Sequence, residues 1–461
     1  MNKRFGKSMM VAGLLLASQQ AGAINLLQAF DLAVQSDPKF AQATAARQSA
    51  EENIPSAVSR LLPTISFVGT ADNVNNDNKT GFTFSGGKRP DAYWSMALNL
   101  RMNQPIYHHD YWVKLSEADS MVAEAEAEYQ AQAQDLIMRT VKAYAGVLVQ
   151  KDVLEFTIAE KEAIARKQEE AKQRFEVGLV AITDVHEAQA AFDQATANVI
   201  MAENGLDNAK EALREIIGDT VDQLTPMTEE IPLVSPDPTD IAQWTERAIH
   251  GNFSVIAARN SVDIARKEVA VQQAGHYPTL DLVASHSVAD SSRDYNVNAG
   301  RTDFSGNPLP ATWQKLGPRY EQDSVGLQLV VPFYQGGAVT SRTRQARHEL
   351  EKYQARLDEM LRAADRSAKD SYRGVVSSIS QVKALKAVVH SSQSALNAAE
   401  AGLEVGTRTM VDVLNEQRNL YKAKQDYSKA RYDYLINGFL LKQAASLLSR
   451  EDIEQANTWM R

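Results

Sequence analysis

The chain of 461 residues contains no cysteine. Disulfide bonds and thiolate metal sites are therefore excluded. The same absence means that no lipid can be attached through a cysteine at a newly formed N-terminus. The folded chain must depend on packing for its stability, and no cofactor is expected.

Long apolar runs are missing after residue 23, where none approaches the roughly 18 residues that a membrane-spanning helix needs. Residues 1–23 combine Lys3, Arg4 and Lys7 with the run MMVAGLLLA and a final AGA, which is typical of a secretory signal peptide. Its removal takes away three basic residues and changes the formal net charge from -9 to -12. An exported chain of this kind is either soluble or crosses a membrane as strands, because bilayers admit only helices and closed barrels.

Positive charge is not in excess, since 49 Lys and Arg stand against 58 Asp and Glu. The chain therefore offers no basic surface of the kind that binds phosphate backbones. Nucleic acid is not expected as a partner.

Proline is absent from two long segments, 109–176 and 337–403, which predict helices. At 1.5 Å per residue, about 67 residues extend on the order of 100 Å. The segments that follow them carry heptad patterns, so we expect antiparallel coiled-coil hairpins. A further helical stretch is predicted at about 240–273. The core positions of the return helices are Val185, Ala188, Phe192, Ala195, Val199, Ala202, Leu206, Ala209 and Leu213 in the first, and Val413, Leu420, Ala423, Tyr427, Ala430, Tyr434 and Leu441 in the second.

Several stretches occur twice in the same order. VGLVAITDV at 177–185 corresponds to VGTRTMVDV at 405–413, and LLPTISFV at 61–68 corresponds to HYPTLDLV at 276–283. We therefore predict tandem repeats over residues 24–217 and 240–447. The proline-rich residues 218–239 are predicted to be a linker or part of a small belt, and residues 448–461 a C-terminal tail.

Each repeat also carries two segments in which apolar and polar residues alternate. In residues 93–103, Trp94, Met96, Leu98, Leu100 and Met102 share one face, and Val325, Leu327, Leu329 and Val331 repeat the pattern. Segments 64–72 and 279–289 show it more weakly, and the polar loops at 73–91 and 290–319 resemble exposed tips. The pattern fits either a membrane barrel or a half-buried sheet of a soluble sandwich. Four strands cannot close a membrane barrel, so a barrel would need several chains.

At this point the chain resembles the TolC family of bacterial outer-membrane export channels, through RFEVGLVAITDV, EVGTRTMVDV, YPTLDL, PFYQGG and ARYDYLIN in their expected order. The resemblance implies an α+β membrane protein. Its homotrimer would form a twelve-stranded β-barrel, four strands per chain, continued by a long coiled-coil α-helical tunnel. It also implies a Gram-negative outer-membrane location, a periplasmic adaptor, and an inner-membrane ABC or proton-driven transporter.

The resemblance also assigns roles at the hairpin tips, which close the periplasmic entrance in this family. By position, Thr183, Asp184 and Arg408 would be closing contacts and Asp412 would face the pore axis. Three copies of Asp412 around an axis would repel one another, raise their pKa values and attract cations. The spacing of Arg408 and Asp412 also fits an ordinary helix-surface pair.

Two positions differ from the family pattern. Leu403 replaces a usual tyrosine, which would remove one contact of the closed entrance, and Asn415 replaces a second acidic residue. The entrance should therefore carry fewer carboxylates. Gly178 and Gly406 precede these contacts, where they allow a tight turn and, in the family, leave room for adaptor docking.

No enzyme activity is expected, because no nucleophile and base can be paired. HHD at 108–110 does not form a convincing metal site, SGGKRP lacks the spacing of a phosphate loop, and HELEK lacks the second histidine of a zinc protease. The favoured function is an exit duct for proteins, by type I secretion, or for small toxic compounds. The alternative is an exported structural or adhesive coiled-coil protein. The aromatics Tyr93, Trp94, Tyr107, Phe333 and Tyr334, near the ends of the strands, favour the duct.

Overall fold

The computed structural model describes residues 23–75, 92–221, 223–228, 230–291, 293–296, 298, 301–317 and 319–460. The predicted signal peptide, apart from Ala23, lies outside these residues, as do residues 76–91 with the SGGKRP stretch. Within the described chain, no helix is both long and apolar enough to span a membrane. The chain forms two compact units, one comprising the residues up to Thr44 with Tyr129–Val255 and Leu361–Arg461, the other Ala45–Glu128 with Ile256–Met360.

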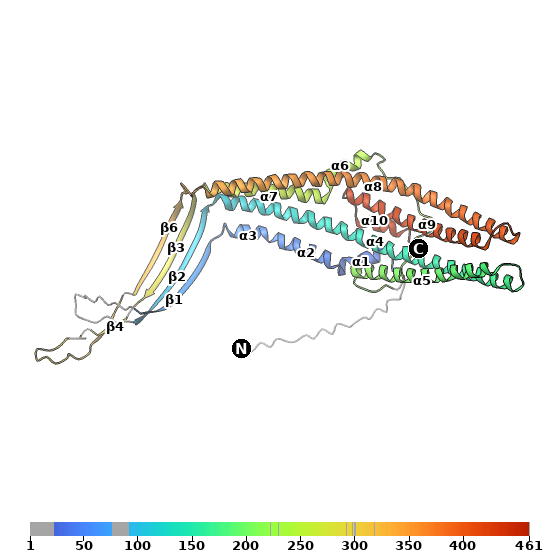
Figure 1. The fold of residues 1–461 in the computed structure, drawn as a ribbon. Helices are drawn as coiled ribbons and strands as arrows, with labels where there is room; N and C mark the ends of the chain where they lie inside the picture. Colours follow the sequence, from blue (N-terminus) through green and yellow to red (C-terminus); the bar gives the residue numbers. More distant parts are fainter. Residues whose placement is uncertain are drawn as a thin grey trace, which may run out of the picture. The chain divides into compact units, whose positions relative to one another are not determined.

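The second unit contains a four-stranded antiparallel sheet in the order β1-β2-β3-β6 (Figure 1). Its strands are β1 Thr64–Asn75, β2 Ala92–Tyr107, β3 Thr279–Asp290 and β6 Arg319–Val330. The four predicted strands are thus confirmed. β1 and β6 are the edges of this sheet and run in opposite directions.

The register gives the sheet one mainly apolar face, which also carries the ion pair of His286 with Asp323. Phe67 lies opposite Leu100, and Leu282 lies opposite Leu327, so large apolar side chains line up across strands. Phe67 is 67% exposed and Leu327 66% exposed in the single chain. The other face carries polar pairs such as Ser285 and Ser324, whose hydroxyls lie 2.8 Å apart. The alternation predicted for residues 93–103 is confirmed.

Two details of the sheet differ from the expectation. Residues 290–319, predicted to be a loop, contain a short hairpin of β4 Arg293–Asn296 and β5 Trp313–Leu316. Four-residue strands are too short to show a convincing alternation in sequence. β2 also continues through Pro105, where the register with β3 shifts between Pro105 and Tyr107. A bulge accommodates a proline that a regular ladder would not.

Helices of the second unit lie side by side and extend from one end of the sheet, in the order α2 and α3, α4, α7 and α8 (Figure 1). They comprise the end of α2 Pro38–Glu51, α3 Asn53–Ser59, and parts of α4 His109–Glu176, α7 Phe253–Ala274 and α8 Ala338–Glu404. Arg47 Nε lies 2.7 Å from Glu126, which joins α2 to α4. Lys114 Nζ lies 2.5 Å from Glu268, which joins α4 to α7. The outer flanks of α3 and α8 have no neighbour among the described residues of this unit.

The first unit has its largest core where the chain termini meet α4 and α9. It contains α1 Leu26–Ser36, α5 Ile182–Ile217, α6 Ile241–Gly251, α9 Met410–Ala444 and α10 Arg450–Asn457. Its buried residues include Leu26, Leu136, Tyr144, Leu213, Tyr432 and Ile453. The C-terminal residues 448–461 are therefore not a simple tail, because α10 packs into this core. The predicted helical stretch 240–273 is interrupted at Asn252, between α6 and α7.

The linker 218–239 contains no helix in its described part, as its prolines predict. It lies against the N-terminal residues through a parallel bridge between Ile24 and Leu224. The buried Tyr144 hydroxyl lies 2.8 Å from the carbonyl oxygen of Thr225. Burial raises the pKa of Tyr144, so its hydroxyl stays a neutral donor.

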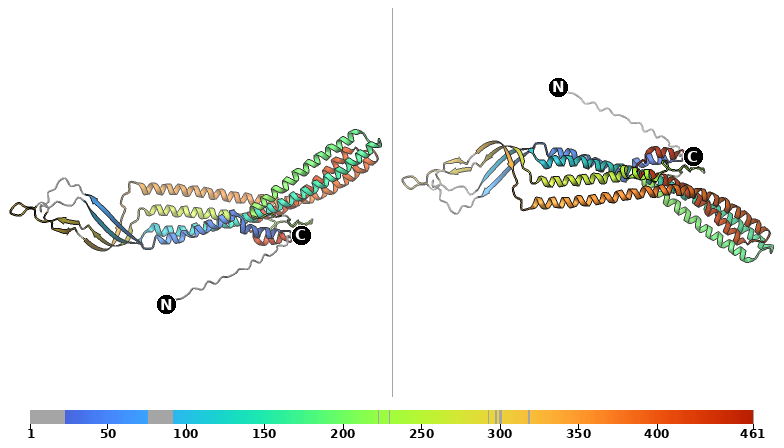
Figure 2. Two further views of the ribbon diagram at one scale, coloured as in Figure 1. Left: turned by 90° about the horizontal axis from the view of Figure 1, so that it is seen from below. Right: turned by 90° about the horizontal axis from the view of Figure 1, so that it is seen from above.

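The predicted helical hairpins are present as α4 with α5 and α8 with α9, and they lie side by side in the first unit (Figure 2). The predicted heptad positions Ala188, Ala195, Val413 and Leu420 are all buried. Alanine at alternate core positions lets the helices approach closely.

Candidate functional site

The first hairpin turn closes α4 through a residue in the left-handed conformation. Gly178 has a φ of 78°, and its amide donates to the carbonyl oxygen of Phe175 at 2.9 Å. The amide of Leu179 donates to the carbonyl oxygen of Arg174 at 2.8 Å. This pair of bonds is a Schellman motif, which satisfies the last carbonyl groups of a helix.

The second turn repeats the motif at the corresponding residues. Gly406 has a φ of 77°, and its amide donates to Leu403 at 3.2 Å. The amide of Thr407 donates to the carbonyl oxygen of Gly402 at 2.8 Å. A Cβ atom at Gly178 or Gly406 would meet nothing within 4 Å. Backbone conformation is thus the reason for glycine within one chain, and the space beside each glycine is open.

The helices that follow the two turns begin differently. Thr409 caps α9, and its amide and hydroxyl both donate to Asp412 Oδ2 at 2.9 Å. Asp412 returns the contact through its own amide, which donates to the Thr409 hydroxyl at 3.2 Å. Ala181 occupies the corresponding position before α5 and has no side chain that can cap it.

These contacts set the charge of Asp412 within one chain. The hydrogen bonds from the Thr409 amide and hydroxyl, with a smaller contribution from Arg408, lower the pKa of the Asp412 carboxyl. The higher pKa expected when three Asp412 side chains surround an axis concerns the assembled protein, and it stays a prediction.

Arg408 turns back over the end of α8. A Cβ atom at Gly402 would lie 2.6 Å from Arg408 Cγ and 3.1 Å from Arg408 Cβ. Gly402 thus gives room for the aliphatic stem of Arg408. Sequence analysis missed both Gly402 and the cap at Thr409, although the three-residue spacing of Thr409 and Asp412 is that of a capping box.

The structure places the other predicted gate residues at the same end of the hairpins. Thr183 is exposed and Asp184 is half-buried in the first turn of α5, and Asn415 is exposed on α9. No ion pair joins Asp184 to Arg408 within the described chain, so their closing contact remains a prediction for the assembled protein.

Leu403 packs beneath the second turn. It contacts a buried cluster that includes Ile164, Ala188 and Met410, and a second cluster around Leu396 and Val413. The position therefore supports hydrophobic packing between the two hairpins.

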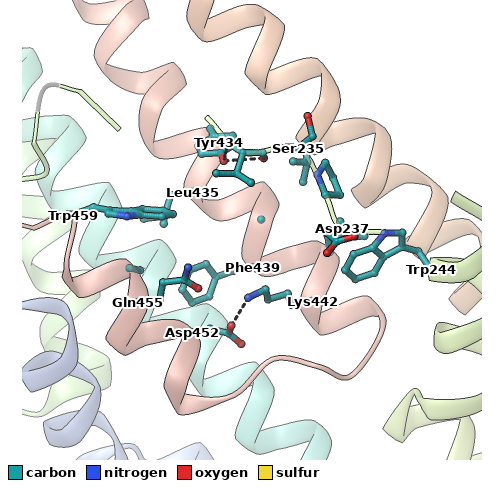
Figure 3. Close-up of a pocket in the computed structure, with 16 residues that line it drawn as sticks. Ser235, Asp237, Trp244, Tyr434, Leu435, Phe439, Lys442, Asp452, Gln455 and Trp459 are labelled. Atoms are coloured by element: carbon teal, nitrogen blue, oxygen red, sulfur yellow. Dashed lines mark hydrogen bonds and ion pairs between the residues drawn. The ribbon is translucent and has the colours of Figure 1, made fainter. Parts of the chain in front are cut away.

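A pocket of about 320 Å³ lies away from the turns, between the linker, α9 and α10 (Figure 3). Trp244, Tyr434 and Phe439 are among its aromatic walls, and Lys442 forms an ion pair with Asp452 at its edge. The Tyr434 hydroxyl accepts a hydrogen bond from the amide of Val234 at 2.9 Å. These groups hold the linker against α9, and they offer no nucleophile aligned with a base.

The HHD stretch forms a structural contact at the base of the sheet. His108 Nε2 lies 3.2 Å from Asp281, and its ring stacks on Tyr111 with ring centroids 4.4 Å apart. Among the described residues, no group of three or more His, Asp or Glu side chains could hold a metal ion.

Comparison with known proteins places this architecture in one family. The family model described as outer membrane efflux protein matches residues 29–219 and 244–445. The outer membrane protein TolC of Vibrio cholerae is 35% identical over 450 residues, covering 98% of this chain and 97% of the relative. The alkaline protease secretion protein AprF of Pseudomonas aeruginosa is 28% identical, with 96% and 89% covered.

A solved structure has the same fold. The CmeC outer membrane channel of Campylobacter jejuni gives a TM-score of 0.74 at 14% identity, covering 95% of this chain and 90% of that channel. Because the family model matches most of the sequence and a relative is similar over nearly all of both chains, this chain belongs to the TolC family of outer membrane efflux proteins.

Proposed function

We propose that three copies of this chain form the outer-membrane exit duct of a Gram-negative export system. The unpaired edges of the sheet carry this proposal. β1 and β6 run in opposite directions, so β6 of one copy can pair with β1 of the next in the antiparallel arrangement used inside the sheet. Three copies would give a closed barrel of twelve strands, which leaves no strand edge unpaired.

The apolar face of the sheet would then contact outer-membrane lipid. Ile65, Leu98 and Leu329 are 68%, 49% and 64% exposed in the single chain. Apolar side chains outside and polar side chains inside are the arrangement of a water-filled membrane barrel. The adhesive coiled-coil alternative explains neither this face nor the similarity to outer-membrane channels.

The helices would continue the barrel as a tunnel. The separate matches of one family model to residues 29–219 and 244–445 support the division into repeats at 24–217 and 240–447, with residues 218–239 between them. Each repeat would give the wall one long helical hairpin and two strands.

The hairpin turns would form the periplasmic entrance. Thr183, Asp184 and Arg408 would hold it closed, and Asp412 would face its axis with Asn415 one turn away. The open space beside Gly178 and Gly406 would accept a periplasmic adaptor, which joins the duct to an inner-membrane ABC or proton-driven transporter.

The cargo would be proteins, small toxic compounds or both. The name of AprF refers to protease secretion, which supports protein export. The chain would act as a conduit without enzyme activity, a cofactor or nucleic acid.

Four measurements test the duct. The protein should require detergent for extraction, migrate as a trimer that heating dissociates, and conduct ions in planar bilayers. Deletion of the gene should abolish secretion of a protein substrate or increase sensitivity to toxic compounds. A detergent-free monomer that does not conduct would contradict the proposal.

A further inference from the structure

The two outer flanks of the helical layer next to the sheet each carry an exposed charged side chain. Glu52 lies between α2 and α3, and Arg344 lies in α8. Both residues are exposed, and within the described chain neither forms an ion pair.

Helical spacing places Glu52 on the flank away from α4. Arg47, which pairs with Glu126 of α4, and the buried Ala57 lie five residues before and after it. Five helical residues turn the direction of a side chain by about 140°. Glu52 therefore lies on the flank opposite to α4, between the small exposed residues Ser49 and Ser56.

Arg344 has the corresponding position on α8. Val339 is buried, and it faces α7, since a Cβ atom at Gly275 would lie 3.1 Å from its Cγ2 atom. Arg344 is five residues later, about 140° around the helix. Arg342, also exposed, is only about 60° from Val339 and lies on the α7 side.

Both side chains lie at a similar distance from the end of the helix that is next to the sheet. Glu52 is seven residues before Ser59, the end of α3, and Arg344 is six residues after Ala338, the start of α8. These spacings correspond to about 9 to 11 Å along each helix. α3 leads into β1 and α8 follows β6, and these strands are the two free edges of the sheet.

From this arrangement we infer that Arg344 of one copy forms an ion pair with Glu52 of the next copy. Pairing of β6 with β1 places α8 beside α2 and α3 of the neighbour, and the two unpaired charges then face each other. Small residues around Glu52 allow the helices to approach, and a carboxylate is the partner that a guanidinium binds best. The inference rests on the proposed trimer and adds the contact that fixes the seam between copies.

Charge exchange tests the pair. Arg344→Glu and Glu52→Arg should each lower the temperature at which the detergent-resistant trimer dissociates, by about 2 to 5 °C. The double exchange should recover at least half of the loss, because it restores attraction with reversed polarity. Arg342→Glu is the matched control, and Glu52→Arg should not rescue it.

Crosslinking tests the proximity directly, because the natural chain has no cysteine. Glu52→Cys combined with Arg344→Cys should give covalent dimers and trimers with a short bismaleimide, whereas either single variant should not. If the wild type is a trimer but the double-cysteine variant gives no crosslinks and the double exchange no recovery, the ion pair is overturned and the duct stays intact. A wild-type protein that is not a trimer would instead overturn the proposed duct.

Discussion

Arg408 lies against Gly402, so closely that a Cβ atom at Gly402 would be 2.6 Å from Arg408 Cγ. The first hairpin has no such contact, because Arg174 and Val180 occupy the corresponding positions. The two turns thus share a backbone and differ in the side chains that cover it. Only in the second turn does a glycine, Gly402, leave room for the side chain of an arginine, Arg408.

Gly402→Ala should displace Arg408 and act like Arg408→Ala. If Arg408 helps to close the entrance, both variants should increase single-channel conductance in planar bilayers. Gly146→Ala is the control, because a Cβ atom there would meet nothing within 4 Å. If Gly402→Ala had wild-type conductance while Arg408→Ala had a higher one, the position of Arg408 would not depend on Gly402.

Bulky substitution at Gly178 or Gly406 should abolish export while the trimer still assembles. Each glycine holds a left-handed conformation at a tip, where a residue other than glycine, asparagine or aspartate costs about 1–2 kcal/mol of local backbone strain. The space beside each glycine is open, so a tryptophan would fit within its own chain and obstruct an approaching adaptor.

Asparagine separates these two effects, because it tolerates the left-handed conformation. Gly406→Asn should therefore assemble with nearly wild-type heat stability, whereas its export shows how much room the adaptor needs. Trimer yield and secretion of a protein substrate are the measurements. Loss of the trimer in the asparagine variant would mean that the glycines serve folding alone.

A new cap should strengthen the first hairpin. Ala181 precedes α5 without a capping side chain, whereas Thr409 caps α9. Ala181→Ser should stabilise the start of α5 by about 0.5 to 1 kcal/mol. Hydrogen exchange should slow at residues 183–185 and stay unchanged at 411–413. Equal exchange in wild type and variant would show that contacts in the assembled tip already replace the cap.

Sequence alone predicted the elements that depend on local periodicity. The alternation around Leu98 gave β2, and the heptads through Ala188 and Val413 gave the hairpins. It could not find α10, because the short helix 450–457 is polar apart from the side chains that pack into a core of distant residues, such as Ile453. It also missed Gly402, since a contact six residues along the chain has no periodic signal.

The ion pair of buried Asp37 with half-buried Arg139 should support stability above acidic pH. Asp37 is 4% exposed, and Arg139 donates to its two carboxylate oxygens at 2.6 and 3.0 Å. Hydrogen bonds from Arg139 lower the pKa of Asp37 despite burial. Asp37→Asn should reduce the stability of the first unit by about 1.5 to 3 kcal/mol at pH 7, since Arg139 keeps its second partner Asp135.

The pH dependence follows from the sign of that shift. A lowered pKa in the folded state contributes stability that is complete above the unfolded pKa of about 3.9 and is lost as pH falls through the folded value. The difference in thermal stability between wild type and Asp37→Asn should therefore be constant from pH 8 to 5 and shrink below about pH 4. Asp31→Asn, which breaks an exposed pair with Arg450, should have a much smaller effect. If the difference in thermal stability already shrank near pH 6, the pKa of Asp37 would not be lowered in the folded state.

Cation block should report on Asp412 at the entrance. If three Asp412 side chains surround the axis without a second acidic ring at Asn415, multivalent cations should block the channel less tightly than with both rings. Coulomb attraction grows with the number of nearby charges. Asn415→Asp should therefore tighten the block, and Asp412→Asn should nearly remove it, whereas Arg408→Ala should raise conductance without changing cation affinity.

The cap at Thr409 gives a second test, through the pH dependence of the cation block. The Thr409 hydroxyl donates to Asp412, so Thr409→Val removes one of the bonds that lower the pKa of Asp412. The Asp412 carboxylate should then gain a proton at higher pH than in the wild type. The cation block should therefore also be lost at higher pH. Planar-bilayer recording at a series of pH values measures both effects. If Asp412→Asn left the block unchanged, Asp412 would not line the pore, and its contacts with Thr409 and Arg408 would be those of an ordinary helix start.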